Sequence, residues 1–196
     1  MINIINKYLK NGYSLISVNS EKEPYVYWKS FHYKKANTED VFGWYNKFTD
    51  VNIGIVTGNI SKLAVIDVDD INLLPELKEI LSEIKETTKV RTRKGYHYYF
   101  SLNGEYVKSN NSLFGKRLEL RSNGKYVVAP PSIINGFKYI FEVPLGRMLS
   151  IPKKLIKKTC LHTDTHRQKG NQWLTWNIKS RKLLKYQHIT VIEWTA

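Results

Sequence analysis

The segment LAVIDVDD, residues 63–70, places an unbroken apolar run directly before three carboxylates. A short apolar and β-branched run of this kind predicts a buried strand. Alternate side chains of a strand share one face, so Asp67 and Asp69 should point to the same side while Val68 points into the core. Two carboxylates on one face repel each other unless a cation lies between them. The segment therefore predicts a buried strand that ends in a polar site.

This acidic pattern has two interpretations. Hard divalent ions such as Mg²⁺ and Mn²⁺ prefer carboxylate oxygens, which makes Asp67 and Asp69 candidate metal ligands. Aspartates also commonly end strands, and Asp70 is placed to cap a following helix. The two aspartates by themselves leave both interpretations open.

Glu119 supplies a third carboxylate. It alternates with leucines in KRLELRS, residues 116–122, so it should lie on the face of a strand opposite the core. If that strand lies beside the strand of LAVIDVDD, the three acids converge. Such a cluster can hold two metal ions, one lowering the pKa of an attacking hydroxyl and one stabilising the leaving oxygen. The alternative is a cross-strand salt bridge to a nearby arginine: Arg91, Arg117 or Arg121.

Two further segments carry candidate phosphate contacts. In VRTRKGYHYYF, residues 90–100, a glycine turn precedes His97, and Arg93 and Lys94 stand close by. Such a donor-rich turn suits the oxygens of a triphosphate, although an edge histidine on a solvated hairpin has the same pattern. Further along, Ser132 follows two prolines that end a strand and fix a rigid loop. Its hydroxyl has either a binding or a purely structural role.

The composition narrows the class of protein. The 196 residues are 42% hydrophobic, which is typical of a globular chain with a real core. Lys and Arg outnumber Asp and Glu by 31 to 17, and the formal charge of +14 predicts a polyanionic partner such as nucleic acid, with a solvated basic surface as the alternative. A single cysteine, Cys160, excludes an internal disulfide and favours a reducing, cytoplasmic setting. The sequence shows neither a signal peptide pattern nor an apolar run near the roughly 20 residues that span a membrane, so no membrane partner is expected.

The order of the predicted elements indicates an α+β fold with a largely antiparallel sheet. Helices are predicted before Gly12, over 37–48 with Thr38 as N-cap, over 73–88 and over 150–158. Strands are predicted over Ser14–Val18, 52–58, 63–69, 89–93, 96–102, 116–122 and 125–130. The runs 52–58 and 63–69 are separated only by NISK, which predicts a hairpin.

The character of the sequence changes near its C-terminal end. We expect a catalytic domain over residues 1–158 and a poorly defined C-terminal tail over 159–196. Cys160, His162 and His166 are candidate zinc ligands, but the sequence offers no fourth ligand at a suitable spacing from them. A loosely held polar tail is therefore the favoured interpretation of this region.

Three stretches of the chain together are similar to a known family. NIGIVTGNISKLAVIDVDD, VRTRKGYHYYF and LELRSNGKYVVAPPS, in this order and spacing, resemble the bifunctional DNA primase/polymerase (prim-pol) N-terminal domain. This domain belongs to the archaeo-eukaryotic primase superfamily and is carried by plasmid and phage replication proteins. EKEPYVYW also resembles the family's Lys-x-Pro…Trp segment, and the resemblance spans roughly residues 10–145. It implies an RRM-like antiparallel catalytic sheet packed with a smaller N-terminal α/β module.

The family pattern is an acidic pair, a small-x-His triplet and a later acid. In this chain it falls on Asp67 and Asp69, on Gly95, Tyr96 and His97, and on Glu119. The resemblance implies that the acids bind two Mg²⁺ or Mn²⁺ ions, that His97 contacts the phosphates of an incoming nucleotide, and that Arg121 is a further contact. The chain departs from the pattern twice, because the third acid is usually Asp and the small residue is usually Ser.

The implied activity is that of a template-dependent nucleotidyltransferase, a DNA primase/DNA polymerase that joins nucleotides and releases pyrophosphate. The expected catalytic residues are Asp67, Asp69, Glu119 and His97, and the expected nucleotide-binding residues are Gly95, His97, Arg93, Lys94, Arg121 and Ser132. The expected partners are a single-stranded or primed DNA template and nucleoside triphosphates, with a replicative helicase as a further candidate. The alternatives are a catalytically inactive DNA-binding replication-initiation domain and a two-metal nuclease.

Aromatic residues add a candidate interface. Trp28, Tyr98 and Tyr99 have side chains that can stack on nucleic-acid bases. Core packing is the commoner fate of aromatic residues on strands.

Overall fold

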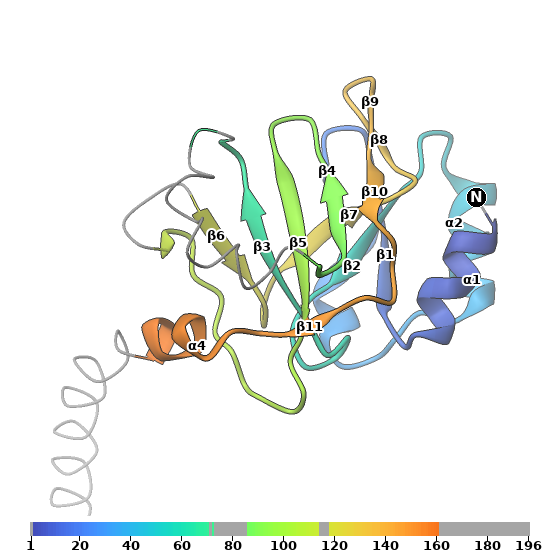
Figure 1. Ribbon diagram of the computed structural model, residues 1–196. Coiled ribbons are helices and arrows are strands. Elements are labelled where there is room, and N and C mark those ends of the chain that lie inside the picture. Colours follow the sequence, from blue (N-terminus) through green and yellow to red (C-terminus); the bar gives the residue numbers. More distant parts are fainter. Residues whose placement is uncertain (1, 71, 73–85, 114–117, 161–196) are drawn as a thin grey trace, which may run out of the picture. The chain divides into compact units, whose positions relative to one another are not determined.

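The computed structural model describes residues 2–70, 72, 86–113 and 118–160 (Figure 1). The chain divides into two units, Met1–Thr159 and Cys160–Ala196, and all the described strands belong to the first. The helix predicted over 73–88 lies almost wholly outside the described residues, as do His162, His166 and the rest of the tail beyond Cys160. Among the described helices, none is both long and apolar enough to cross a membrane.

A smaller sheet contains β1 (Ser14–Val18), β2 (Asn52–Val56) and β7 (Tyr126–Ala129) in the order β1-β2-β7, with antiparallel pairing throughout. Every residue of β1 and β2 is buried, so both faces of these two strands are covered. Helices α1 (Ile2–Lys10) and α2 (Thr38–Lys47) and the 3₁₀ helix η1 (Trp28–His32) all contact β1. The helical elements of the first fifty residues thus pack against β1, the edge strand of the smaller sheet.

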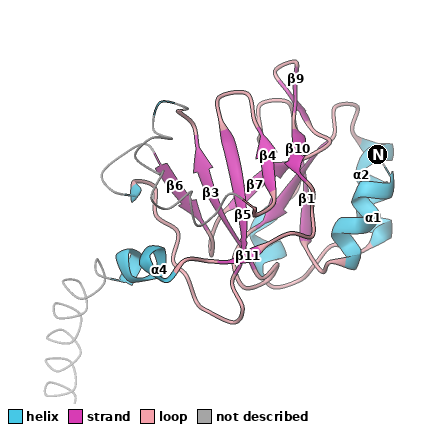
Figure 2. Cartoon of the chain, viewed as in Figure 1, coloured by secondary structure: helices cyan, strands magenta, loops and turns pink. Residues whose placement is uncertain are grey.

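A larger sheet carries the sequence motifs. Its strands follow the order β10 (Ile140–Val143), β4 (Lys89–Arg91), β5 (Tyr96–Ser101), β3 (Leu63–Val68) and β6 (Leu118–Arg121). These pairs are antiparallel, while the short β11 (Leu149–Ser150) runs parallel to β5. Strands β8 (Ile133–Ile134) and β9 (Phe137–Lys138) form a separate hairpin, and α4 (Lys153–Cys160) ends the described chain. Figure 2 shows that strands dominate the described structure and that its helices lie at the margins.

Two hydrophobic cores cover the two faces of the larger sheet. The first joins this sheet to the smaller one, since Val65 and Tyr99 pack in the same cluster as Ile55 and Val128. The second lies on the opposite face, where the other side chains of β3, β5 and β6 meet residues of the 102–113 loop and of α4, among them Leu155. Because strand side chains alternate, the central strands β3 and β5 contribute residues to both cores.

The predicted hairpin between residues 52–58 and 63–69 is wrong. β2 pairs with β1 and β7, whereas β3 pairs with β5 and β6, and only a bridge between Gly58 and Leu63 closes the turn between them. Every residue of both strands is buried, which is the pattern of central strands rather than of an isolated hairpin. Each strand therefore needs two neighbours and lies inside a different sheet.

The start of α2 also differs from the prediction. Asn37, not Thr38, is the N-cap, because its side chain accepts a hydrogen bond of 2.7 Å from the Asp40 amide. The Asp40 carboxylate accepts a 3.0 Å bond from the Asn37 amide in return, which completes a capping box. The class itself is confirmed: the described residues combine helices and strands, with mostly antiparallel sheets and few helices.

Candidate active site

Asp67 lies near the end of β3, the strand with β5 on one side and β6 on the other. The register places His97 of β5 directly opposite Asp67 on one side and Glu119 of β6 directly opposite it on the other. Directly opposed residues of antiparallel strands share one face of the sheet. Asp67, His97 and Glu119 therefore form a continuous row across three neighbouring strands, as the sequence predicted for Asp67 and Glu119.

This row lies on the face that packs toward the smaller sheet. Arg121 is directly opposite Val65, two residues before Asp67, and so shares that face. The intervening side chains, such as Val68 and Leu120, belong to the core on the other face. The alternation in LELR thus separates a charged face from an apolar one, and in LAVIDV it places Asp67 at the end of a face that Leu63 and Val65 keep apolar.

Arg121 links the two acids of the row. Its Nε donates a 2.8 Å hydrogen bond to Asp67 Oδ2, and its Nη2 lies 2.8 Å from Glu119 Oε2. This is the cross-strand salt bridge that the sequence left open as an alternative for Glu119. Of the other two candidate arginines, Arg91 lies 4.8 Å from the centre of the Tyr96 ring, and Arg117 lies outside the described residues.

Asp67 is a buried charge, with only 6% of its surface exposed. Burial alone raises the pKa of its carboxyl, but His97 and Arg121 outweigh that effect and hold this pKa well below its usual range. Oδ1 of Asp67 lies 3.3 Å from His97 Nε2 without the alignment of a hydrogen bond, and neither Oδ1 nor His97 Nδ1 has a hydrogen-bond partner among the described residues. A buried carboxylate oxygen in this state is an acceptor that a ligand or ion can satisfy.

Asp67 and His97 line a pocket of about 280 Å³ between the two sheets, which we call the inter-sheet pocket, whereas Glu119 is not among its lining residues. The larger sheet contributes three of the sequence-predicted residues to its wall: Asp67, His97 and Arg121. The remaining wall comes from Lys22, Trp28, residues 124–128 and Tyr139. Three basic side chains, those of Lys22, Lys125 and Arg121, thus surround a single buried aspartate, which suits an anionic ligand.

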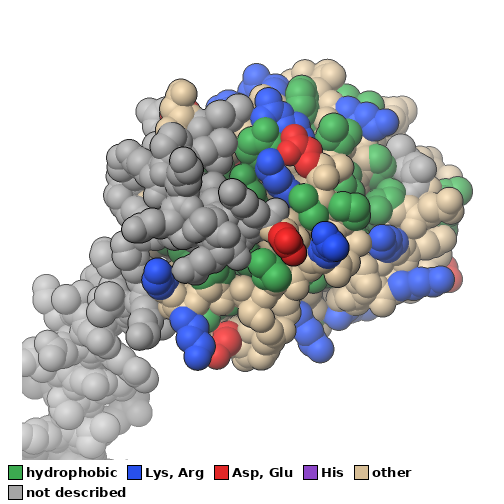
Figure 3. Space-filling model, viewed as in Figure 1, with side chains coloured by type: hydrophobic (Ala, Val, Ile, Leu, Met, Phe, Trp, Pro, Cys, Tyr) green, Lys and Arg blue, Asp and Glu red, His purple; other side chains and the backbone are tan. Residues whose placement is uncertain are grey.

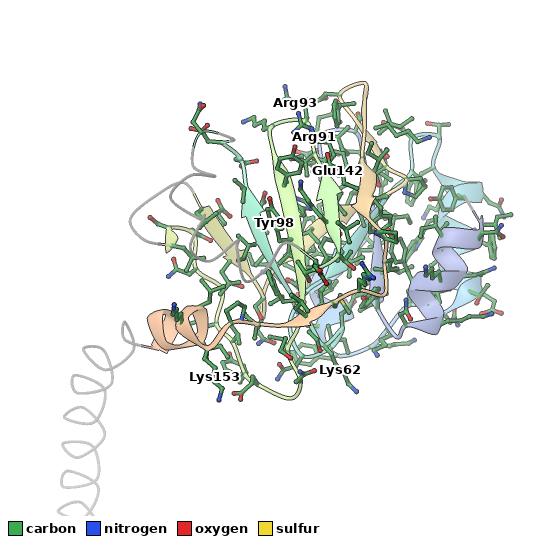
Figure 4. The ribbon with its side chains drawn as sticks, viewed as in Figure 1. Lys62, Arg91, Arg93, Tyr98, Glu142 and Lys153 are labelled. Atoms are coloured by element: carbon green, nitrogen blue, oxygen red, sulfur yellow. The ribbon has the colours of Figure 1, made fainter. Side chains whose placement is uncertain are left out.

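Tyr139 reports where the more exposed charges lie. Burial, and to a lesser extent the charges of Asp67 and Asp69, raise the pKa of Tyr139 to about 12, while the charge of Arg93 acts in the opposite direction. Asp69 itself is exposed, one residue beyond the end of β3. Figure 4 shows Arg93 at the β4–β5 turn, at the same end of the sheet as Arg91 and Glu142. Asp69, Arg93 and Lys94 are all exposed, and none of them is among the residues that line the inter-sheet pocket.

Gly95 has a steric role that the sequence did not predict. It is buried, and a Cβ built on it would collide with the carbonyl oxygen of Val68. Its amide donates a 3.1 Å hydrogen bond to Thr92 Oγ1, and its carbonyl accepts one of 2.9 Å from the Thr92 amide. The close approach of β3 thus leaves no room for a side chain at this position.

Ser132 lies apart from this pocket. Its hydroxyl accepts a 2.9 Å hydrogen bond from the Ile53 amide of β2, its own amide donates to the Ala129 carbonyl, and the side chain is buried. Another surface pocket, beside the C-terminal end of α2, includes Ser132 in its wall, but the inter-sheet pocket does not. The geometry thus gives the hydroxyl a structural partner.

The donor set at the row has the chemistry of a site for a hard divalent ion. Asp67 and Glu119 present carboxylate oxygens side by side, and Asp67 Oδ1 lacks a hydrogen bond. Within the part of the chain that the structure describes, no three His, Cys, Asp or Glu side chains are grouped closely enough to hold a metal ion. The Arg121 guanidinium lies between the two carboxylates and neutralises them in the way that a bound cation would.

Several residues of the pocket escaped sequence reasoning. Nothing in the sequence singled out Lys125 or Tyr139, whereas Lys22 and Trp28 are the Lys and Trp of the EKEPYVYW segment, which resembles the family's Lys-x-Pro…Trp segment. Trp28 was a candidate for base stacking and does line the pocket, while Tyr98 and Tyr99 are buried in the two cores, so the stacking interpretation is wrong for those two. In Figure 3, basic side chains recur over the visible face with only isolated acids among them, as the net charge predicts.

Comparison with known proteins adds one match. The family model described as "Bifunctional DNA primase/polymerase, N-terminal" matches residues 5–153, which span both sheets and the inter-sheet pocket. No curated protein matches the chain. Because the family model matches well over half of the sequence, this chain belongs to the prim-pol family of bifunctional DNA primase/polymerase N-terminal domains.

Proposed function

We propose that this chain is a template-dependent nucleotidyltransferase that extends or starts a nucleic-acid strand. A strand's 3′-hydroxyl attacks the α-phosphate of an incoming nucleoside triphosphate. The new oxygen–phosphorus bond forms, the bond between the α- and β-phosphates breaks, pyrophosphate leaves, and the hydroxyl proton passes to solvent. The row of Asp67, His97 and Glu119 across three neighbouring strands, with Asp67 and His97 in the wall of the inter-sheet pocket, is the observation that carries the proposal.

Asp67, Glu119 and Asp69 would hold the two Mg²⁺ or Mn²⁺ ions that the family implies. Bound there, the ions supply a lowered pKa for the attacking hydroxyl and stabilisation of the leaving oxygen. Asp67 suits this role because its carboxylate stays ionised at neutral pH and one of its oxygens lacks a hydrogen bond. Asp69 lies one residue beyond the strand, so the backbone after Val68 has to bring it toward the row.

The basic residues would hold the triphosphate. Arg121 reaches both acids in this structure, so it must leave them when an ion is held there, and its fork of donors then suits phosphate oxygens. His97 lies in the pocket wall, and Lys22 and Lys125 face it from the other side. Arg93 and Lys94, on the exposed turn, complete the positive rim. Gly95 contributes the close packing of β5 on β3, and Ser132 is left out of the proposed site.

We infer an RRM-like catalytic sheet from the antiparallel order around β3 and from the position of the acids on one face. The smaller module is formed from the N-terminal elements together with β7, which enters from residues 126–129. Whether a replicative helicase accompanies the domain stays a prediction from the resemblance.

A primer-extension assay tests this function. The full chain is incubated with a labelled primer on a single-stranded template, with Mg²⁺ or Mn²⁺ and with ribo- or deoxyribonucleotides. We expect longer products with the wild type and none with Asp67→Asn, which preserves the shape of the side chain but removes its charge. Asp50→Asn, an exposed aspartate outside the row, is the matched control and should extend normally.

The same gel separates the alternatives. A two-metal nuclease would shorten the labelled strand, and a catalytically inactive binding domain would leave its length unchanged in every condition. The salt bridges of Arg121 favour the inactive alternative, because they already neutralise two of the three acids. If the wild type never extends the primer while still binding DNA, the nucleotidyltransferase proposal is refuted.

A further inference from the structure

An exposed aromatic and basic segment lies beside the inter-sheet pocket. The segment YWKSFHYKK, residues 27–35, contains η1 and the turn that follows it, and we call it the aromatic segment. Tyr27 is 75% exposed and Tyr33 is 90% exposed. Two large aromatic rings held in solvent a few residues apart are unusual in a surface that has no ligand.

The segment is anchored by its other rings, so its exposed tyrosines do not serve the core. Trp28 packs edge-on against Tyr126 at 4.9 Å, and Phe31 packs edge-on against Trp44 at 5.8 Å. Neither Tyr27 nor Tyr33 has a ring partner among the described residues. The two phenol rings are therefore presented outward from a fixed base.

Hydrogen bonds hold the backbone of this segment in place. The Ser30 hydroxyl donates a 2.8 Å bond to the Tyr27 carbonyl, and the Tyr33 amide donates a 3.0 Å bond to the Ser30 carbonyl. The Ser14 hydroxyl also donates a 2.7 Å bond to the Phe31 carbonyl, which ties η1 to β1. Rings on a rigid backbone lose little entropy when a ligand stacks on them.

The charge of the segment is wholly positive. Lys29, Lys34 and Lys35 are exposed, and none of them forms an ion pair with a residue that the structure describes. The sequence contains no Asp or Glu between Glu23 and Glu39. A run of cations with interleaved exposed aromatics matches the two needs of a single-stranded nucleic acid, phosphate neutralisation and base stacking.

A second pocket connects this surface with the proposed active site. It has a volume of about 540 Å³ and is lined by Tyr27, Trp28, Lys29, Ser30, His32, Tyr33 and Gly124. Trp28 and Gly124 also line the inter-sheet pocket, so the two pockets share a wall. A strand that leaves the acidic row can therefore pass Trp28 and continue over the aromatic segment.

We propose that the aromatic segment binds the single-stranded part of the DNA template, with bases stacked on Tyr27 and Tyr33 and phosphates neutralised by the three lysines. The identification of this strand as a template rests on the proposed function. The binding itself does not, because it needs neither metal ion nor nucleotide. Stacking accepts any base, so the surface should bind single strands without sequence preference.

Fluorescence anisotropy with labelled oligo(dT) tests the surface, using the full chain with chelator present and no nucleotide. Replacement of an aromatic that stacks on a base weakens binding by roughly 5- to 150-fold, so Tyr27→Ala with Tyr33→Ala should raise Kd at least tenfold. Tyr27→Phe with Tyr33→Phe retains both rings and should bind almost as the wild type does. Tyr106→Ala, at a tyrosine 67% exposed outside the segment, is the matched control and should leave Kd unchanged.

Two outcomes overturn the proposal. One is wild-type affinity in the double alanine variant, which would direct attention to a protein partner for this surface. The other is an equal loss of affinity in the double phenylalanine variant, which would show that stacking is not the source of binding. Asp67→Asn keeps the two proposals apart, since we expect it to bind oligo(dT) normally while it fails to extend a primer.

Discussion

Replacing Arg121 with methionine tests whether this guanidinium stabilises the acidic row in place of a cation. Methionine keeps an unbranched stem of similar length but removes the charge and the donors. In Arg121→Met, the Asp67 carboxylate remains buried and keeps only His97 as a close polar neighbour, with Nε2 of His97 3.3 Å from Oδ1 of Asp67. Removing one partner of a fully buried ion pair costs about 3–5 kcal/mol. Since Arg121 is 26% exposed and His97 remains, we expect a loss of about 2 kcal/mol.

Urea unfolding measures this loss. With a slope of about 2 kcal/mol per molar urea, a loss of this size lowers the midpoint by about 1 M. Arg147→Met is the matched control, because Arg147 is exposed. Its free energy of unfolding should stay within about 0.5 kcal/mol of the wild-type value. A double-mutant cycle with Asp67→Asn should return a coupling close to the whole loss, because the two charges contact each other.

Manganese provides the decisive comparison. A ligand that binds only the folded state at about 100 times its Kd stabilises it by about 2.7 kcal/mol. Arg121→Met should gain more stability from Mn²⁺ than the wild type gains, because the ion no longer displaces a guanidinium from Asp67 and Glu119. Equal gains in both proteins, or a negligible coupling in the cycle, would refute the view that Arg121 and a metal ion compete for the row.

Three further predictions follow from single contacts. Gly95→Ser should destabilise the fold by about 1–3 kcal/mol, because the new Cβ would collide with the Val68 carbonyl oxygen. Gly43→Ala, at an open position on α2, should instead stabilise the fold by about 0.5–1 kcal/mol, and thermal unfolding of both variants tests the comparison. Ser132→Ala removes the hydrogen-bond acceptor of the Ile53 amide and should lower the free energy of unfolding in urea by about 1–3 kcal/mol, while primer extension stays intact. Loss of extension in a folded Ser132→Ala protein would show that Ser132 belongs to the active site. The pKa of Tyr139 is raised to about 12, chiefly by burial, so above a pH of about 10 the unfolded chain loses this proton before the folded chain does. The urea midpoint should therefore fall steadily between pH 10 and 12. A midpoint that stays constant over this range would contradict the buried position of the Tyr139 hydroxyl.

The local patterns of the sequence predicted much of this structure. Alternation of apolar and charged residues in LAVIDVDD and LELRS correctly placed Asp67 and Glu119 on one face and Val68 on the other, because the side-chain period of a strand is fixed by its backbone. The helix before Gly12 and the last helix near Lys153 were also confirmed. These are local properties that short-range backbone geometry controls.

Strand partners could not be predicted in the same way. The sequence separation of β2 and β3 favoured a hairpin, yet each strand is central in its own sheet, since the pairing of a strand depends on every other strand that competes for its edges. β7 joins the smaller sheet from more than seventy residues further along the chain, and its preceding turn brings Lys125 to the pocket. The residues that complete the pocket therefore depend on contacts that no local pattern carries.

The residue types, their alternation along each strand and the excess of positive charge follow from the sequence alone, and they were sufficient to suggest the family and the acidic row. The tertiary structure decided that Arg121 occupies the space between Asp67 and Glu119, that Gly95 is required by the neighbouring β3 backbone, and that Tyr27 and Tyr33 remain in solvent beside the site. The physical reason is that charge pairing, steric contact and burial are properties of atoms brought together from distant parts of the chain, whereas side-chain alternation belongs to each strand separately.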